Sequence, residues 1–107
     1  MRSVSENVIF IRPKGQLLLR HVNKYRVYFV QESGMGAIKI GFTQDVGARV
    51  KDLAAATPHK LPTLVTIEGD HQVERAIHRR FSHARIRGEW FRPVPELLAY
   101  IAEIKVA

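Results

Sequence analysis

The chain contains no cysteine among its 107 residues. This absence excludes a disulfide-stabilised scaffold, a thiolate zinc site and a cysteine nucleophile. Long hydrophobic runs are also missing: none approaches the roughly 20 residues of a membrane-spanning helix, and the first residues lack the apolar core of a secretory signal. We therefore expect a cytoplasmic protein with no membrane partner.

Acidic residues are scarce, because ten Asp and Glu stand against 17 Lys and Arg and the formal net charge is +7. Glu89 is the one acid in an arginine-rich stretch between Arg75 and Arg92. A solvated helix face is the plain interpretation of this stretch. Arginine outnumbers lysine, however, and its planar guanidinium matches phosphate oxygens. The stretch therefore predicts a nucleic-acid partner, DNA or RNA, contacted by Arg75, Arg79, Arg80, Arg85 and Arg87.

Hydrophobic patterning predicts one α+β domain after an N-terminal extension. Apolar runs at 8–11 and 17–22 flank Pro13-Lys14-Gly15 and predict a hairpin within residues 1–24. Residues 25–107 then alternate predicted strands (25–31, 37–42 and 63–67) with helices that begin near Val46, after Gly69-Asp70 and at Pro95. This order of strand, strand, helix, strand, helix, helix predicts helices packed on a small sheet.

The predicted helices each have an apolar face. The first is capped by Thr43 or Asp45, and Arg49 borders its apolar stripe. In the second, Arg80 falls inside the apolar stripe, so either the helix ends near Arg79 or Arg80 extends past the core toward an anion. The inward residues are Val46, Val50, Leu53 and Ala54 in the first helix, Val73, Ala76, Ile77 and Phe81 in the second, and Leu97, Leu98, Ile101 and Ile104 in the third.

Four polar residues are placed where a site between helix and sheet is expected. Glu74 and His78 have i, i+4 spacing and share one helix face, although such pairs are often weak surface contacts. Tyr28 and Lys39 share a sheet face if the hairpin loop has an even length. They are directly opposite with a Ser33-Gly34 loop and diagonal with Gly34-Met35. Lys39 alternatively only protects an edge strand.

Several of these residues occur in an order that resembles a known family. Val27-Tyr28, Lys39-Ile40-Gly41, Thr43, Arg49 and Glu74 resemble the GIY-YIG nuclease superfamily, over residues 25–92. The spacing Glu-x-x-x-His-x-x-Phe and the segment Gly88-Glu89-Trp90-Phe91 resemble its small phage and bacterial branch. Arg26 replaces the first glycine of the GIY motif and Lys39 replaces the tyrosine of YIG. The late asparagine of many members has no counterpart, because Asn7 and Asn23 both precede the core.

The resemblance implies a three-stranded, mainly antiparallel sheet flanked by helices, and an endonuclease that hydrolyses DNA with Mg²⁺ or Mn²⁺. Glu74 is then the metal ligand, Arg49 stabilises the phosphate and Lys39 occupies the position of the second tyrosine. Tyr28 is the family's general base, and we expect Lys39 to lower its pKa. His78 is the competing base. Gly41 permits close backbone approach, whereas Trp90 and Phe91 are expected to be structural.

Two other classes of function are consistent with the sequence. One is a non-catalytic nucleic-acid-binding module with the same fold, and the other is an interaction domain of a phage regulator that is basic for solubility. The resemblance places the protein in a bacterium or, as a phage protein, in the host cytoplasm. Both a monomer and a homodimer are compatible with the sequence.

Overall fold

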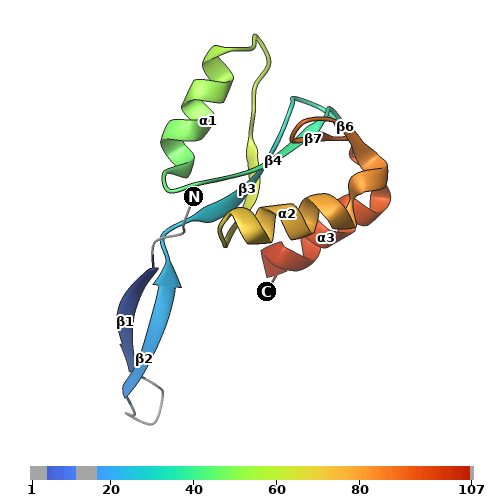
Figure 1. Ribbon diagram of the computed structural model, residues 1–107. Coiled ribbons are helices and arrows are strands. Elements are labelled where there is room, and N and C mark those ends of the chain that lie inside the picture. Colours follow the sequence, from blue (N-terminus) through green and yellow to red (C-terminus); the bar gives the residue numbers. More distant parts are fainter. Residues whose placement is uncertain (1–4, 12–16, 107) are drawn as a thin grey trace.

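The computed structural model describes the backbone of residues 5–11 and 17–106, and the side chains of residues 23–106. Strands β1 (Ser5–Ile11) and β2 (Leu17–Asn23) pair antiparallel as a two-stranded hairpin. This hairpin projects away from the rest of the chain (Figure 1). The turn predicted at Pro13-Lys14-Gly15 lies outside the described residues.

The second sheet is antiparallel and has the strand order β5-β3-β4-β7-β6. Its three longest strands are β3 (Arg26–Gln31), β4 (Ile38–Thr43) and β5 (Thr63–Glu68), which are the strands that the sequence predicts; β5 forms one edge. A short hairpin of β6 (Arg85–Arg87) and β7 (Trp90–Phe91) extends the β4 edge. Strands of two and three residues are too short to show alternation, so hydrophobic patterning does not detect them. The predicted α+β class is confirmed, with a sheet two strands wider.

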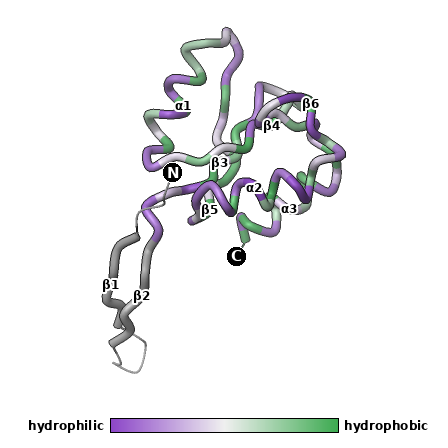
Figure 2. The backbone as a smooth tube through the Cα atoms, in the orientation of Figure 1, coloured by the Kyte–Doolittle hydropathy of each residue, from purple (hydrophilic) through white to green (hydrophobic). Residues whose placement is uncertain are grey.

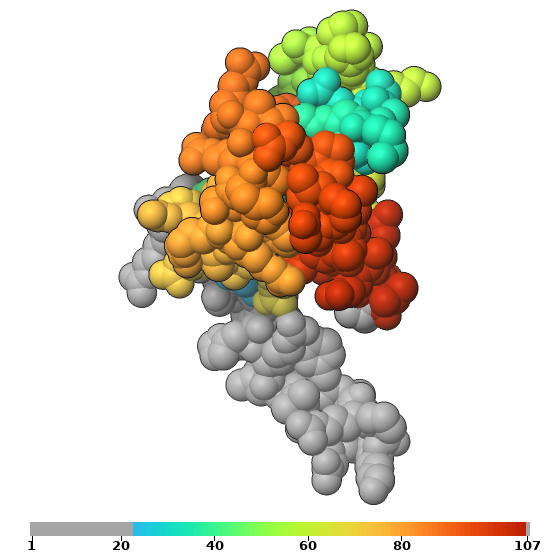
Figure 3. Space-filling view, turned by 90° about the vertical axis from the view of Figure 1, so that its right-hand side faces the viewer, coloured from blue at the N-terminus to red at the C-terminus, as the bar shows by residue number. Residues whose placement is uncertain are grey.

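Three helices cover the two faces of this sheet (Figure 1). Helix α1 (Val46–Ala55) lies against β3 and β4, while α2 (His71–Arg80) and α3 (Pro95–Val106) pack side by side on the opposite face (Figure 3). Asp45 caps α1 by accepting a hydrogen bond from the amide of Ala48, which decides between the two predicted caps. No helix in the described part of the chain has the length and apolar character needed to cross a bilayer.

The hydrophobic core lies between the sheet and helices α2 and α3. Alternation along β3 and β4 directs one set of side chains to this face, and it packs against the apolar stripes of α2 and α3. The cluster comprises Val27, Phe29, Ile38, Ile40, Ile77, Phe81, Ala84, Phe91, Leu97 and Ile101. Figure 2 shows hydrophobic tracts along the central strands, whereas α2 is hydrophilic over most of its length.

Helix α1 contributes no buried residue. Val46, Val50 and Leu53 are half-buried, as a helix that packs on the sheet requires, but Ala54 is exposed. The predicted apolar face of α1 is therefore right only in part. The physical reason is that the sheet face beneath α1 carries Tyr28 and Lys39. Because this face is not apolar, the helix does not pack tightly against it.

The first of the two placements predicted for Arg80 is confirmed, because helix α2 ends at Arg80, one residue after Arg79. The Arg80 side chain is not directed toward an anion: its guanidinium carbon lies 4.6 Å from the ring centroid of Tyr100 and 5.3 Å from that of Phe81. Tyr100 itself packs on Phe29 and Phe81. A cation stacked on aromatic faces keeps its charge at the surface while its aliphatic part covers the core. This stacking lets an arginine occupy an apolar position of the helix.

Candidate active site

The hairpin of β3 and β4 places Tyr28 and Lys39 on the same face of the sheet. Tyr28 pairs with Gly41, and Lys39 pairs with Val30, so the two side chains are diagonal neighbours. This is the register predicted for an even-length loop at Gly34-Met35. Gly34 has φ +77°, a left-handed conformation that glycine adopts without steric cost.

A cleft of about 390 Å³ opens on this face, between the sheet and α1. Tyr28 and Lys39 enter it from the strands, Arg49 enters it from α1, and Glu89 enters it from the turn between β6 and β7. Its other lining residues are Tyr25, Phe42, Thr43, Gln44 and Leu53. The structure therefore brings together three of the predicted catalytic residues, and it adds one acid that the sequence analysis did not assign to the site.

Gly41 lets the backbone of β4 approach Tyr28 closely. A Cβ atom at this position would overlap the Tyr28 hydroxyl, and it would lie 2.6 Å from Cζ of Tyr28 and 3.0 Å from Oε1 of Glu89. Tyr28 is 2% exposed and has no room to withdraw. The absence of a side chain at Gly41 thus creates the space that the tyrosine hydroxyl occupies.

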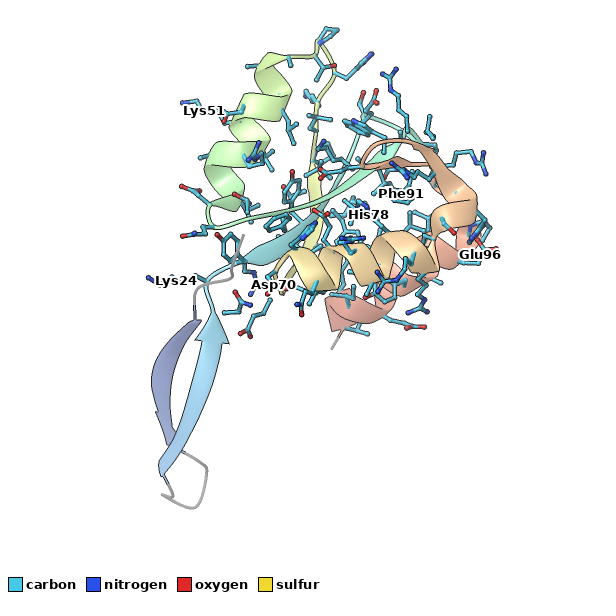
Figure 4. All side chains as sticks on the ribbon, viewed as in Figure 1. Lys24, Lys51, Asp70, His78, Phe91 and Glu96 are labelled. Atoms are coloured by element: carbon cyan, nitrogen blue, oxygen red, sulfur yellow. The ribbon has the colours of Figure 1, made fainter. Side chains whose placement is uncertain are left out.

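The outer edge of β4 holds Glu74 and His78 of α2. Strand β7 pairs only with Ile38 and Lys39, so the outward backbone groups of Ile40 and Phe42 need other partners. His78 Nε2 lies 2.8 Å from the carbonyl oxygen of Ile40, and Glu74 accepts a hydrogen bond from the amide of Phe42. Because a carbonyl oxygen only accepts, Nε2 is the protonated nitrogen of His78. Its ring also lies beside Phe91, 4.9 Å between centroids (Figure 4).

Glu74 is a buried acid whose oxygens are not fully satisfied. Its side chain belongs to a residue that is 4% exposed, and Oε2 has no hydrogen-bond partner among the described residues. Burial, together with the neighbouring negative charge of Glu89 and against the opposing effect of Lys39, raises the pKa of Glu74 from 4.5 to about 7. A buried carboxylate oxygen without a hydrogen-bond partner among the described residues is a candidate to bind a cation.

Glu89 is the site residue that the sequence analysis missed. Its Oε1 lies 3.3 Å from Nζ of Lys39, and its carboxyl group is in hydrogen-bonding contact with Glu74. The same Lys39 ammonium lies 5.4 Å from the ring centroid of Trp90, which is half-buried, whereas Phe91 is fully buried in the core. The sequence signal for Glu89 was its position as the single acid within an arginine-rich stretch.

The expected effect of Lys39 on Tyr28 is wrong. Burial, together with the negative charge of Glu89, raises the pKa of Tyr28 to about 12. The cation that opposes the shift is Arg49. The ammonium of Lys39 is paired with Glu89 and lowers the pKa of Glu74 in place of that of Tyr28.

The predicted nucleic-acid-binding arginines separate into three surfaces. Arg75, Arg79 and Arg85 line one groove of about 260 Å³ together with His78 and Ser82. Arg87 lines a different hollow, formed with Glu32, Ala37, Ile86 and Trp90. Arg80 lines the groove between α2 and α3, where it stacks on Tyr100. Only the first groove concentrates arginines, and it contains no acid.

The donor groups at the cleft fit an oxygen-preferring divalent cation. Two carboxylates in contact, one of them with a buried free oxygen, are the hard ligands that Mg²⁺ and Mn²⁺ prefer. No cluster of three or more potential protein ligands occurs within the described part of the chain. Water and substrate oxygens would therefore complete the coordination.

The raised pKa of Glu74 predicts a pH-dependent stability of the metal-free protein. Between about pH 5 and pH 7 the unfolded chain has lost this proton while the folded chain retains it, so the free energy of unfolding falls as the pH rises. The total decrease in the free energy of unfolding is on the order of 3 kcal/mol, and it is absent in the Glu74→Gln variant, which has no proton to lose. Urea denaturation in the presence of a chelator measures it, and parallel pH profiles for the two proteins would contradict the assignment.

The close approach at Gly41 predicts that Gly41→Ala destabilises the protein by about 1–3 kcal/mol, because the rigid Tyr28 ring cannot yield to the added methyl group. Gly47→Ala in α1 is the matched control, since the nearest atom to its Cβ is 3.6 Å away. That control is expected to be neutral or stabilising by up to about 1 kcal/mol. Thermal and urea unfolding compare the two variants, and equal stabilities would rule out the clash.

Comparison with known proteins adds one family match. The family model of the T5orf172 domain matches residues 25–105, a span that contains every residue of the cleft. No curated protein and no solved structure gives a significant match to the chain. The T5orf172 domain is phage-associated, occurs in GIY-YIG-like and HNH-like nucleases, and suggests a nuclease or nucleic-acid-binding role. Because the match covers most of the chain, the protein belongs to the T5orf172 domain family.

Proposed function

We propose that this protein is a metal-dependent endonuclease of the GIY-YIG type that hydrolyses phosphodiester bonds of DNA. The observation that carries the proposal is the free Oε2 of Glu74, a buried acid that does not line the cleft but whose charge acts on Tyr28 within it. Arg49 lines the same cleft. A buried carboxylate oxygen without a donor destabilises the folded chain unless it binds something. A divalent cation, Mg²⁺ or Mn²⁺, is the ligand that suits it.

Arg49 is the residue that we assign to the phosphate. Its side chain belongs to an exposed position of α1 and lines the cleft opposite the strands. The negative charge of a phosphodiester grows in the transition state, and a guanidinium donates two parallel hydrogen bonds to its oxygens. When a divalent cation is bound at Glu74, it supplies further positive charge for the phosphate and the leaving oxygen.

Tyr28, rather than His78, is the residue that we assign to the attacking water. His78 uses its Nε2 hydrogen to bind the backbone of β4, which makes it a positioning residue. The Tyr28 hydroxyl is protonated at neutral pH, because its pKa is about 12 in the protein alone. It therefore orients the water by hydrogen bonding, and it takes up the proton of the water only after positive charge in the occupied cleft has lowered its pKa.

The arginine groove is our proposed path for the rest of the DNA strand. Arg75 and Arg79 lie one turn apart on α2, and Arg85 follows on β6. His78 lies between this groove and the edge of β4 that also holds Glu74. Phosphates bound in the groove would therefore lie next to the strand edge that supports the cleft.

A non-catalytic nucleic-acid-binding module is the second candidate, and the same groove favours it. Such a module needs only the arginines to bind nucleic acid. It therefore does not explain why Glu74 is buried with an oxygen that has no hydrogen-bond partner. The two functions differ in what Glu74 contributes. In a nuclease the Glu74→Gln variant binds DNA and does not cleave it, whereas in a binding module the change has no effect on either property.

Plasmid nicking tests the proposed hydrolysis. With Mg²⁺ or Mn²⁺ present, wild-type protein is expected to nick supercoiled plasmid, and Glu74→Gln and Arg49→Ala are each expected to lower the rate at least about 100-fold. Lys51→Ala is the matched control, because it removes a positive charge from the exposed side of α1, away from the sheet (Figure 4). A chelator should abolish the reaction. Wild-type rates in the Glu74→Gln variant would refute the proposed hydrolysis.

The salt dependence of DNA binding tests the arginine groove. Replacing Arg75 and Arg79 together with alanine is expected to reduce the slope of log K against log salt by about 0.9 for each phosphate that the variant no longer neutralises. Lys105→Ala, in the last turn of α3, provides a control outside this groove that also removes positive charge. Fluorescence anisotropy at several salt concentrations measures the slopes. Equal slopes in the double variant and the control would place the DNA elsewhere.

A further inference from the structure

Glu89 is the residue of the cleft to which the proposed function gives no role. It occupies the turn between β6 and β7, where two backbone features hold it in place. Gly88 has φ +53°, a left-handed conformation that favours glycine, and the carbonyl oxygen of Glu89 accepts a hydrogen bond from the amide of Ile40 at 2.9 Å. The turn thereby brings the Glu89 carboxylate to Lys39, at 3.3 Å.

The carboxyl groups of Glu89 and Glu74 form an unusual pair, because they come from different elements and meet inside the site. Oε1 of Glu89 lies 3.0 Å from the position of a Cβ atom on Gly41. The helix turn that carries Glu74 is bound to the neighbouring Ile40 through His78. At this short range the charge of Glu89 disfavours ionisation of Glu74.

Two carboxylates in contact repel each other unless a proton or a cation is held between them. Lys39 pairs with Glu89, but Oε2 of Glu74 has no partner among the described residues. When both acids are ionised, the pair has two negative charges and one paired cation, Lys39, so that one negative charge is left uncompensated.

We propose that Glu89 is a second carboxylate ligand of the divalent cation at Glu74, and that Lys39 holds Glu89 in place until the cation binds. The inference rests on the proposed function only for the presence of a cation at Glu74. Two carboxylates, with water and phosphate oxygens in the other positions, form a donor set typical of Mg²⁺ and Mn²⁺. A ligand in the turn after β6 also links the cation to the strand that carries Arg85.

Mn²⁺ titration of the full chain without DNA measures this site independently of cleavage. The electron paramagnetic resonance signal of free Mn²⁺ reports how much is bound. Quenching of the fluorescence of Trp90, the single tryptophan of the sequence, reports whether Mn²⁺ binds near Glu89. Trp90 follows Glu89 in the chain and lies under the Lys39 ammonium. The variants are Glu89→Gln and Glu74→Gln. Glu96→Gln is the matched control, an exposed acid at the start of α3 (Figure 4).

Glu89→Gln and Glu74→Gln are each expected to weaken Mn²⁺ binding roughly tenfold or more, and Glu96→Gln is expected to leave it unchanged. Removing Glu89 also exposes the charge of Lys39, so the comparison is repeated in a Lys39→Met background. There Glu89→Asp retains the negative charge on a side chain one methylene shorter. If Glu89 coordinates the cation, both Glu89→Gln and Glu89→Asp still weaken binding in that background. Circular dichroism verifies that each variant is folded.

Three results would overturn the inference. The first is wild-type affinity in Glu89→Gln, and the second is an effect of Glu89→Gln that vanishes with Lys39→Met, which would make Glu89 only the counterion of Lys39. The third is the absence of Glu74-dependent Mn²⁺ binding up to millimolar concentrations. In each case, metal-dependent nicking of plasmid would still support the proposed function. Mn²⁺ bound through both acids without any nicking would support the inference and refute the nuclease.

Discussion

The unpaired edge of β4 is the constraint on which the rest of the site depends. Strand β7 covers only Ile38 and Lys39, so the next outward backbone groups belong to Ile40 and Phe42. His78 of α2 binds the carbonyl oxygen of Ile40, and Glu74 of α2 accepts a hydrogen bond from the amide of Phe42. The amide of Ile40 donates to the carbonyl oxygen of Glu89. Four helical residues rise about 6 Å and two strand residues about 6.8 Å, so the i, i+4 pair matches successive outward positions of the strand. This match sets α2 along the strand edge.

The position of α2 has a consequence for the chemistry. A helix that completes a strand edge with an acid and a histidine brings polar side chains into a region bounded by Phe91 and the other core residues. The acid is then desolvated, which raises its pKa and leaves one oxygen without a donor. Such an arrangement lowers the stability of the chain alone and increases the gain from binding a cation. Functional sites commonly reduce the stability of a fold in this way.

The other face of the sheet is open for a different reason. Helix α1 has no buried residue, because the strand face below it carries Tyr28 and Lys39 and leaves the cleft between helix and sheet. A helix held by half-buried side chains is among the less tightly packed elements of a fold. Arg49 belongs to this helix, so the position of its side chain can adjust when a phosphate binds.

The sequence by itself determined the α+β class, the three longest strands and the helix positions, and it limited Tyr28 and Lys39 to a shared face or to opposite faces according to the length of the hairpin loop. These features follow from local patterns: alternation, caps, and a hairpin whose loop length sets the register. Tertiary structure decided which residues meet across separate elements. The contact of Glu89 with Glu74, the pairing of Lys39 with Glu89, the stacking of Arg80 on Tyr100 and the raised pKa of Tyr28 all depend on burial and on neighbours distant in the chain. Periodicity carries no information about such neighbours, because desolvation and pairing arise only once the helices lie against the sheet.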